Sequence, residues 1–442
     1  MQPYPMSRTY LRTSLCRLLL FSFASIGLVQ GQTKWVGSWA ASQQLVEPRN
    51  SLAGDDLRDS TLRQVVHLSL GGAELRLHLS NRFGTASLHF NSIHIARPVS
   101  VSSAKIDRSS DKALTFSGKA EVTVPAGADY ISDAAVFPVR ALSDLTITLH
   151  VEDPPTSQTG HPGSRATSYF VHGDLVSAAD LPTAQKVEHW YFIAGVDVTV
   201  PGDSAAIVTL GDSITDGHGA TTDENNRWPD QLARRLQAAS ARQPLAVLNQ
   251  GIGGNRLLLD GLGPNALARL DQDVLAQAGV RYLMVLEGIN DIGTLTRDKD
   301  ASPAEHDSLV QRIVGAYEQI VTRAHTHGIK VIGATILPFA GSQYYHPGPA
   351  SEADRQAVNR WIRTPGHFDA FVDFDKGTRD PDHPDRLLPK FDCGDHLHPS
   401  PEGYGAMASA VPLSLFRPWA ENHHAATQPR TALKGKFQHE AR

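Results

Sequence analysis

The chain has 442 residues, of which 41% are hydrophobic and 20% are charged, and its formal net charge is −5 at pH 7. A chain of this length and composition can bury a large core, and it favours two domains over one. The acidic excess argues against nucleic acid and other polyanions as partners. We therefore expect a globular, water-soluble protein.

The first 31 residues differ in composition from the rest of the chain. Arg8, Arg12 and Arg17 precede the apolar stretch 18–29, and no acidic residue occurs among residues 1–31. The apolar stretch spans about 12 residues, whereas a helix that crosses a bilayer needs ~20. We predict a signal peptide at 1–31 and a secreted mature protein, extracellular or periplasmic, without a membrane span. A retained membrane anchor is the alternative.

The sequence contains two cysteines, and one of them, Cys16, lies in the predicted leader. Cys393 is then the only cysteine of the mature chain, so an intramolecular disulfide is excluded. The acidic residues beside Cys393 leave a reactive thiol open as a possibility. We expect instead that Cys393 is a buried, small hydrophobic residue.

Residues 33–200 read as a β-sandwich domain. Short alternating segments are separated by Gly, Pro, Ser and Asn, and no long helical pattern occurs. In segment 74–79, three leucines alternate with polar residues, so that one face of the strand is buried and the other is wet. Six or more such strands predict an antiparallel, jelly-roll-like or Greek-key sandwich. The best strand candidates are 62–70, 74–79, 87–95, 120–124, 145–151 and 190–198.

After a boundary at 201–203 the pattern changes to continuous apolar runs alternating with amphipathic segments. This alternation predicts a three-layer α/β/α domain with a parallel sheet at 203–421. The polar remainder, 422–442, is predicted to be a flexible C-terminal tail. It contains a pair of histidines but no other potential metal ligands that would favour a metal site. The predicted strands are 205–210, 246–248, 282–286, 331–335 and 371–372, and the predicted helices are 228–239, 264–277, 303–327 and 351–363.

Polar residues that suit acyl transfer follow the predicted parallel strands. Ser213 follows the first strand, the glycines Gly253 and Gly254 follow the second, and Asn290 follows the third. Because ligands of an open parallel sheet bind beyond the carboxyl ends of its strands, these residues should share one rim. They offer a hydroxyl nucleophile, backbone amides and a side-chain amide for an oxyanion.

A fourth group near the C-terminus supplies an acid and a base. In the run 392–399, Asp395 and His398 are three residues apart, a spacing that lets both side chains point the same way in a turn. His396 lies in the same run and is a second candidate for the base. Together the four groups contain what a serine hydrolase needs. No cofactor is required. The sequence also indicates no metal site, because no other potential metal ligands stand at ligand spacing from His218, His325 or His327.

The four groups resemble the conserved blocks of the SGNH hydrolases, also called GDSL esterases and lipases. The resemblance covers the second half of the chain and rests on segments 211–214, 249–255, 288–291 and 395–398. It implies that Ser213 is the nucleophile, that Asp395 orients His398 as the base, and that Ser213, Gly254 and Asn290 form the oxyanion hole. Gly253 remains the alternative source of the second amide. Ile289 stands where a second glycine is common in the family, which leaves the asparagine in place.

The first half resembles the secreted two-domain branch of that family, in which a β-sandwich precedes the hydrolase. This resemblance rests on segments 35–40, 81–84, 161–165 and 226–229. It implies a short-chain acyl ester, with acetyl as the expected acyl group, on a plant or microbial polysaccharide or oligosaccharide. By analogy with this branch, the expected reaction is the deacetylation of such a glycan.

Further residues near these blocks are candidates for contact with substrate. They are Asp212, Arg227, Trp228 and Glu287. For Arg227 and Trp228 a place in the core is the alternative, and for Glu287 a buried or capping role. Two other functions also remain open: a lysophospholipase or thioesterase, which would use the same residues, and a carbohydrate-binding protein with a degenerate hydrolase half.

Overall fold

The computed structural model describes residues 33–239 and 244–416, which lie in one compact unit. The predicted signal peptide, Cys16 and the predicted tail 422–442 fall outside the described residues. Among the helices that are described, none is long and apolar enough to span a bilayer.

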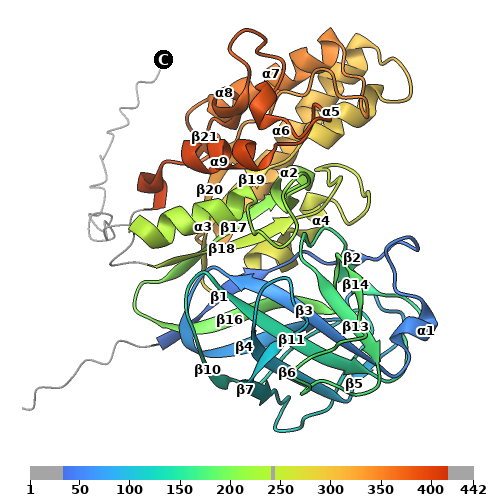
Figure 1. The fold of residues 1–442 in the computed structure, drawn as a ribbon. Helices are drawn as coiled ribbons and strands as arrows, with labels where there is room; N and C mark the ends of the chain where they lie inside the picture. Colours follow the sequence, from blue (N-terminus) through green and yellow to red (C-terminus); the bar gives the residue numbers. More distant parts are fainter. Residues whose placement is uncertain (1–32, 240–243, 417–442) are drawn as a thin grey trace, which may run out of the picture. The chain divides into compact units, whose positions relative to one another are not determined.

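The first half consists of antiparallel sheets, as the alternating pattern predicted (Figure 1). One sheet has the order β1-β16-β4-β10, with β9 also paired to β4, and a six-stranded sheet has the order β14-β13-β3-β11-β6-β7. Short strands form two smaller sheets, β15-β12-β2 and β5-β8. The bounds are β1 (Thr33–Ala40), β2 (Gln44–Leu45), β3 (Ser60–Leu68), β4 (Gly72–Ser80), β5 (Leu88–Phe90), β6 (Ser92–Pro98), β7 (Ile106–Ala113), β8 (Val122–Val124), β9 (Asp129–Ile131), β10 (Ala135–Val139), β11 (Ser143–Val151), β12 (Thr159–His161), β13 (Ser168–His172), β14 (Gln185–Val187), β15 (Trp190–Tyr191) and β16 (Ile193–Pro201), with one short helix, α1 (Gly54–Leu57).

Strand β4 shows how the alternation builds a core. Leu75, Leu77 and Leu79 are fully buried. The polar residues between them face the neighbouring strand β16, where the Arg76 guanidinium and the His78 ring each lie 2.8 Å from the Asp197 carboxylate. One face therefore joins the sandwich core, while the other is held by ion pairs.

Two predicted strands are divided in the structure. Segment 87–95 is split between β5 and β6 at Asn91, and segment 190–198 is split between β15 and β16 at Phe192. Phe192 has φ of 62°, a left-handed conformation that a strand cannot continue through. Apolar periodicity continues across both breaks, and for that reason the sequence pattern did not reveal them.

The second half contains one parallel sheet with the order β18-β17-β19-β20-β21. In chain order this is 2-1-3-4-5, so the connection from β17 to β18 runs toward one edge of the sheet, and the connection from β18 to β19 returns past β17 toward the other edge. Such a reversal opens a crevice at the carboxyl ends of the strands, where ligands bind. The strands are β17 (Ala205–Gly211), β18 (Leu245–Gly251), β19 (Val280–Leu286), β20 (Lys330–Ala334) and β21 (Ala370–Val372).

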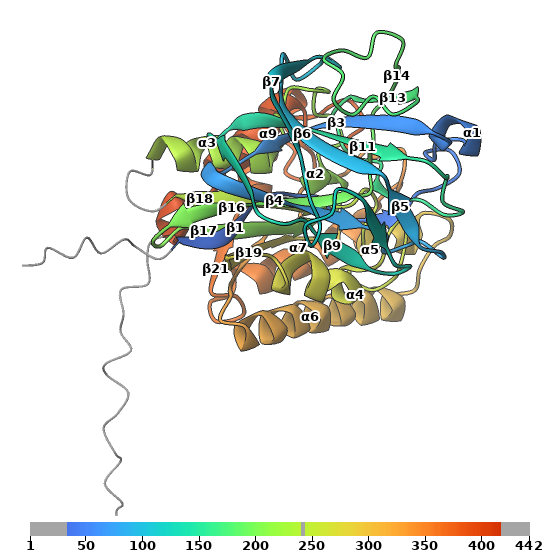
Figure 2. The same ribbon diagram turned by 90° about the horizontal axis from the view of Figure 1, so that it is seen from below.

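Helices cover both faces of this sheet, which confirms the three-layer prediction. α3 and α9 pack on one face, whereas α4, α6 and α7 lie on the other (Figure 2). The pattern did not predict α5, α8 or α9, and α5 and α9 contain glycines that weaken a helical signal. The bounds are α2 (Ser213–Asp216), α3 (Trp228–Ala239), α4 (Ala266–Leu270), α5 (Ile289–Thr296), α6 (Pro303–Thr326), α7 (Pro349–Arg363), α8 (Phe374–Thr378) and α9 (Pro401–Ala410).

The predicted helix 264–277 is shorter than expected and changes type. After α4 the chain continues as a single π-helical turn (Asp271–Leu275). π-turns are rare and are often found near functional sites. Its consequence for the site is the placement of Asp273 next to Arg269, described below.

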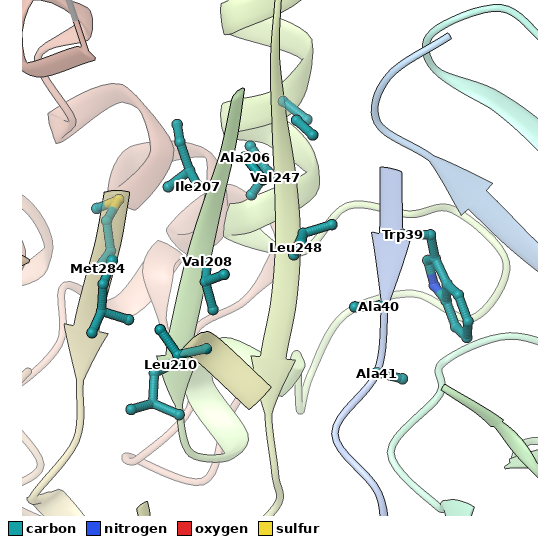
Figure 3. Close-up of a cluster of buried hydrophobic side chains, with 14 of the residues drawn as sticks. Trp39, Ala40, Ala41, Ala206, Ile207, Val208, Leu210, Val247, Leu248 and Met284 are labelled. Atoms are coloured by element: carbon teal, nitrogen blue, oxygen red, sulfur yellow. The ribbon is translucent and has the colours of Figure 1, made fainter. Parts of the chain in front are cut away.

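A continuous apolar core runs from the sandwich into the α/β half. Ile207 and Val208 of β17 are fully buried, as expected for a strand covered on both faces (Figure 3). On the far side of β18, Gly37 of β1 lies against Leu248, and its amide donates a hydrogen bond to the Ala278 carbonyl (2.9 Å). Antiparallel pairing gives way to parallel pairing between the end of β16 and the start of β17.

Candidate active site

A cavity of about 630 Å³ lies where the loops after the parallel strands meet the C-terminal run 394–398. Ser213 follows β17, Gly254 follows β18 and Asn290 follows β19, so the sheet brings together the three groups that the sequence placed at its rim. The residues that line the cavity are Ser213, His218, Gly253, Gly254, Leu262, Asn290, Gln343, Tyr344, Tyr345, Gly394, Asp395, His396, Leu397 and His398.

Ser213 is the first residue of the short helix α2 and follows directly on β17. Asp212 is the N-cap, and its Oδ1 accepts a hydrogen bond from the Ile214 amide (2.9 Å). The end of β18 packs closely against this helix, because a Cβ at Gly251 would lie 2.2 Å from the Asp216 nitrogen. The cap and the close approach together fix the turn that carries the Ser213 hydroxyl.

Ser213, His398 and Asp395 form one chain of contacts. Ser213 Oγ lies 2.8 Å from His398 Nε2, and His398 Nδ1 lies 2.6 Å from Asp395 Oδ2. With Nδ1–H donated to the carboxylate, Nε2 is free to accept the serine proton. The expected spacing of acid and base thus produces the expected geometry, and the second histidine of the run, His396, is not part of it.

The Asp395 carboxylate is held by its own loop. Its Oδ1 accepts hydrogen bonds from the amides of Leu397 (3.0 Å) and His398 (2.8 Å). Partial burial opposes ionisation, but the hydrogen bonds and the charge of His398 outweigh it, so the pKa of Asp395 lies well below its usual range. Asp395 therefore stays ionised wherever His398 needs it as an orienter.

The neighbours of this pair in the run have other partners. The His396 ring pairs with Asp392, Nδ1 to Oδ2 at 2.6 Å, instead of approaching Ser213. Cys393 is exposed, so the prediction of a buried residue was wrong, since the loop turns its side chain outward. Partial burial and the nearby Asp395 charge raise the pKa of the Cys393 thiol to about 11, which keeps the thiol protonated at neutral pH.

His218 also lines the cavity, although the sequence gave it no role. Its ring centroid is 4.0 Å from that of His398, and its Nε2 is 3.7 Å from Asp395 Oδ2. Burial, together with the positive charges of His398 and Arg165, lowers the pKa of His218 to about 4. His218 is therefore a neutral ring against the base at neutral pH. Among the described residues, His218, Asp395 and His398 are also close enough to form a metal-ligand group.

Asn290 presents its amide group to the cavity. Its Nδ2 donates one hydrogen bond to the Asn255 carbonyl (2.8 Å), and its Oδ1 accepts one from the Tyr345 hydroxyl (2.5 Å). These two partners fix which way the amide points, and they leave the second N–H for a ligand. Gly254 has φ of 67°, a conformation that favours glycine and turns the loop past the cavity.

Three acids lie buried behind these loops. Burial raises the pKa of Asp212 to about 7, with the nearby Asp291 charge adding to the effect, and burial raises that of Asp291 to about 6. Glu287, also fully buried, has a pKa raised well above its usual value by burial and by Asp212. The Arg269 guanidinium lies beside this group, with Nη2 3.4 Å from Glu287 Oε1.

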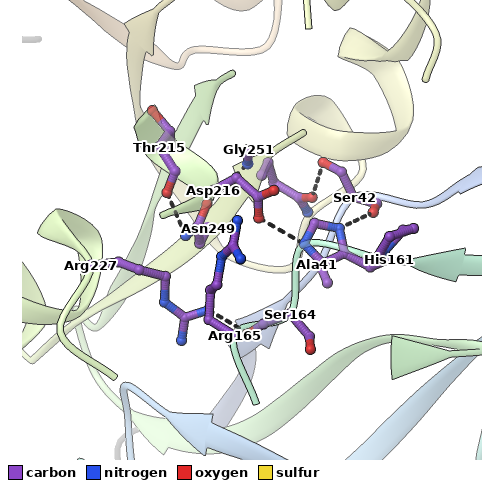
Figure 4. Close-up of polar contacts among 12 residues, drawn as sticks. Ala41, Ser42, His161, Ser164, Arg165, Thr215, Asp216, Arg227, Asn249 and Gly251 are labelled. Atoms are coloured by element: carbon purple, nitrogen blue, oxygen red, sulfur yellow. Dashed lines mark hydrogen bonds and ion pairs between the residues drawn. The ribbon is translucent and has the colours of Figure 1, made fainter. Parts of the chain in front are cut away.

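The four residues predicted to contact substrate do not line the cavity. Asp212 and Glu287 belong to the buried layer just described, and Trp228 is fully buried against Phe374. The Arg227 guanidinium binds Asp230 (2.6 Å). It also binds the Ser164 carbonyl (3.1 Å; Figure 4). Because all four side chains are engaged in the interior, we do not propose that they touch substrate.

The β-sandwich supports the helix of Ser213 from below. His161, at the end of β12, places Nε2 2.8 Å from the Asp216 carboxylate and Nδ1 2.8 Å from the Ser42 carbonyl (Figure 4). Asp216 is three residues after Ser213 and, like His161, is almost fully buried. A contact between segments this far apart in the sequence could not be read from spacing.

Comparison with known families decides the class of this half. Residues 209–406 match the model of the GDSL-like Lipase/Acylhydrolase family. The chain carries a GDSL-like lipase/acylhydrolase domain. The match begins in β17, two residues after Ile207, and ends within α9, so it includes every residue group that lines the cavity. The protein is accordingly an ester hydrolase.

Solved structures resemble the GDSL-like domain at low identity. A lipase/acylhydrolase from Enterococcus faecalis is 19% identical, with a TM-score of 0.35 over 47% of this chain and 92% of that one. A GDSL-like lipase from Bacteroides thetaiotaomicron is 18% identical, with a TM-score of 0.35 over 48% and 87%. An acetyl xylan esterase variant from Geobacillus stearothermophilus is 21% identical, with a TM-score of 0.34 over 47% and 92%. These scores carry no inference about substrate. No curated protein matches the chain.

Sequence reasoning missed three residues of the GDSL-like domain that shape the site: His218, Tyr345 and Arg269. His218 had a usable signal, since it follows Ser213 by five residues, just after a helix of four. Tyr345 and Arg269 had none, because each reaches its partners from a distant part of the chain.

Proposed function

We propose that the protein hydrolyses esters through an acyl-enzyme on Ser213. The observation that carries the proposal is the Ser213–His398–Asp395 chain, with contacts of 2.8 and 2.6 Å at the wall of the cavity. A hydroxyl, a base in the required tautomer and an ionised orienter are the components of a serine hydrolase. A degenerate hydrolase would have no reason to keep all three in contact.

The first half of the reaction forms the acyl-enzyme. His398 Nε2 takes the Ser213 proton as Oγ attacks the ester carbonyl, and the oxyanion is held by the amides of Ser213 and Gly254 and by the Asn290 side chain. The carbonyl then re-forms, the bond to the alcohol oxygen breaks, and His398 returns the proton to that oxygen. Water next attacks the acyl-enzyme with His398 as its base, which releases the acid and restores Ser213.

For the substrate we propose a short acyl group, such as acetyl, on a bulky alcohol such as a sugar. The cavity, at about 630 Å³, is far larger than an acetyl group requires, so most of it would hold the alcohol part. Tyr344 lies in its wall and is more than half exposed, with Tyr345 at 4.7 Å between ring centroids and the Arg297 guanidinium 5.7 Å from the Tyr344 ring centroid. An exposed aromatic ring of this kind suits the apolar face of a sugar ring.

We further propose that the enzyme is secreted. The support is the composition of residues 1–31, in which arginines precede a short apolar stretch without acidic residues. An extracellular or periplasmic location would give the enzyme access to acetylated polysaccharides or oligosaccharides.

The first test is the hydrolysis of p-nitrophenyl acetate by wild type and by Ser213→Ala. We expect the substitution to lower kcat by about 10⁴-fold or more, because no neighbouring group can replace the nucleophile. Unchanged thermal unfolding and circular dichroism would show that the variant is folded. Retained turnover in the folded variant would refute the proposal.

The second test concerns the acyl chain, since Leu262 lines the cavity and is partly exposed. This apolar side chain favours the second candidate, an acylhydrolase for longer chains such as a lysophospholipase or a thioesterase. We expect kcat/KM for the acetyl ester to exceed that for the decanoyl ester, and acetate to be released from an acetylated polysaccharide. The reverse order of the two esters would establish the second candidate.

A further inference from the structure

Arg269 lies at the centre of a buried polar network beneath the loops of the cavity. Its side chain is only 2% exposed. It stands near the end of α4, and the π-helical turn that follows places Asp273 Oδ2 2.9 Å from its Nη1. A buried guanidinium needs several acceptors to offset the loss of water, so its partners show which parts of the chain it holds.

Arg269 binds main-chain oxygens at the ends of two strands. Nη2 donates to the carbonyl of Gly211 (2.9 Å), which is two residues before Ser213. Nη1 donates to the carbonyl of Gln250 (2.7 Å), which is four residues before Gly254. One planar group therefore sets the distance between the loop of the nucleophile and the loop of the second oxyanion amide.

The same guanidinium reaches the loop of the third oxyanion donor. Nε and Nη2 donate to Asn255 Oδ1 at 3.0 and 2.9 Å, and the Asn255 carbonyl accepts the hydrogen bond of the Asn290 amide (2.8 Å). Nη2 also lies 3.4 Å from Glu287, three residues before Asn290. Arg269 is thus linked to Asn290 in two ways, through Asn255 and through Glu287, which lies in the same loop as Asn290.

A residue of the β-sandwich completes the network. Ser42, in the loop between β1 and β2, has its hydroxyl 2.9 Å from Arg269 Nη1, 2.6 Å from Gln250 Oε1 and 2.8 Å from Asp273 Oδ2. All these atoms are buried. The first half of the chain therefore contributes a hydrogen-bonding group to the layer on which the cavity loops rest.

We infer that Arg269 is a positioning residue for catalysis, which sets the spacing of the Ser213, Gly254 and Asn290 donors and, through Ser42, makes that spacing depend on the β-sandwich. The inference rests on the proposed function. Arg269 touches neither substrate nor reacting atoms. Its effect is exerted on the transition state, because donors displaced by a fraction of an ångström stabilise an oxyanion less while binding the ester nearly as well.

The test compares Arg269→Lys with wild type on p-nitrophenyl acetate. Lysine keeps the charge but lacks the planar fork and cannot reach all of these acceptors. We expect kcat to fall about 10- to 100-fold while KM changes less than about threefold. The matched control is Arg63→Lys, at a buried arginine in the β-sandwich that binds Thr148 and three backbone carbonyls. It should lower Tm but leave kcat within about twofold.

A double-mutant cycle separates positioning from a structural role. If Arg269 acts through the oxyanion hole, its substitution should cost much less kcat in an Asn290→Ala background than in wild type. Additive effects of the two substitutions, or a kcat for Arg269→Lys within twofold of wild type, would overturn the inference.

If Arg269→Lys does not fold, Ser42→Ala decides the matter. It removes one hydroxyl from the network without changing a charge, and we expect kcat to fall about 3- to 10-fold. An unchanged kcat would overturn the inference. Hydrolysis that does not depend on Ser213 would refute the proposed function, whereas Ser213-dependent hydrolysis that is insensitive to Arg269 and Ser42 would refute only the positioning role.

Discussion

The two sides of the cavity are built in different ways. Asp395 and His398 sit on one short loop, and the carboxylate accepts its hydrogen bonds from residues within three positions in the sequence. The oxyanion side is assembled from three strand ends, and Arg269 reaches across 58 positions to Gly211 and 227 to Ser42. The proposed base is thus positioned locally, whereas the proposed oxyanion hole depends on long-range buried contacts.

The two sides also differ in their exposure to solvent. The Asp395 side chain is 40% exposed, whereas those of Arg269 and Glu287 are at most 2% exposed. A charged group near water keeps most of its hydration free energy, whereas a buried charged group loses it and needs hydrogen-bonding or charged partners. We therefore expect substitutions on the base side to cost less stability than substitutions on the oxyanion side, which should lower activity and stability together.

The largest effect should come from the base side. His398→Ala removes the only ring in contact with Ser213 Oγ among the described residues, and kcat for p-nitrophenyl acetate should fall about 10⁴-fold. His396→Ala is the matched control, since that ring lines the same cavity but pairs with Asp392. Its kcat should stay within about twofold of wild type. A loss of similar size in both variants would mean that turnover requires both rings, and it would contradict the assignment of His398 as the sole base.

On the oxyanion side, Asn290→Ala should lower kcat about 10²- to 10³-fold with little change in KM, because it removes a donor to the transition state. Tyr345→Phe is the finer comparison, because it deletes only the hydroxyl that holds the Asn290 Oδ1. It should cause a smaller loss, again in kcat. If KM rose in both variants while kcat held, Asn290 would be a binding group for the ground state instead.

The smallest expected effect concerns how the melting temperature depends on pH. Asp212 has its pKa raised to about 7 by burial and by Asp291, so ionising it in the folded state costs stability. That cost is absent near pH 4, grows as pH rises, and is complete above about pH 7. Asp212→Asn keeps an acceptor for the Ile214 amide, so the Tm of the variant minus that of wild type should rise from pH 4.5 to pH 8.

The control for this pH series is Asp373→Asn, because the partner of that carboxylate is Arg363 (2.9 Å), which keeps its charge throughout the range. The pKa of Asp373 is lowered, so the stability that its carboxylate contributes is present above the ordinary value and is lost only as pH falls below it. The Tm difference for this variant should therefore be flat between pH 5 and pH 8. A flat difference for Asp212→Asn as well would show that Asp212 is not the carboxyl that burial keeps protonated.

The contrast also explains how much could be predicted from the sequence. The sheet and the flanking helices α3, α6 and α7 follow from periodicity, which local rules describe. The Asp395–His398 pair follows from short spacing together with the resemblance to the SGNH hydrolases. Arg269, Tyr345 and Ser42 were not found, because their roles exist only once distant segments are packed. The orientation of Cys393 was predicted incorrectly for a related reason, since composition gives a residue's tendency to be buried but not the direction in which a loop turns it.

The pairing of β1 with β16 has a consequence for the order of folding. Thr33, at the start of the first described strand, lies opposite Pro201 in the ladder. The antiparallel sheet that contains β1 and β16 therefore cannot be completed until the ribosome has made nearly half of the chain. Contacts of such long sequence separation also form slowly. Until then the edge strand β1 has no partner strand in this sheet.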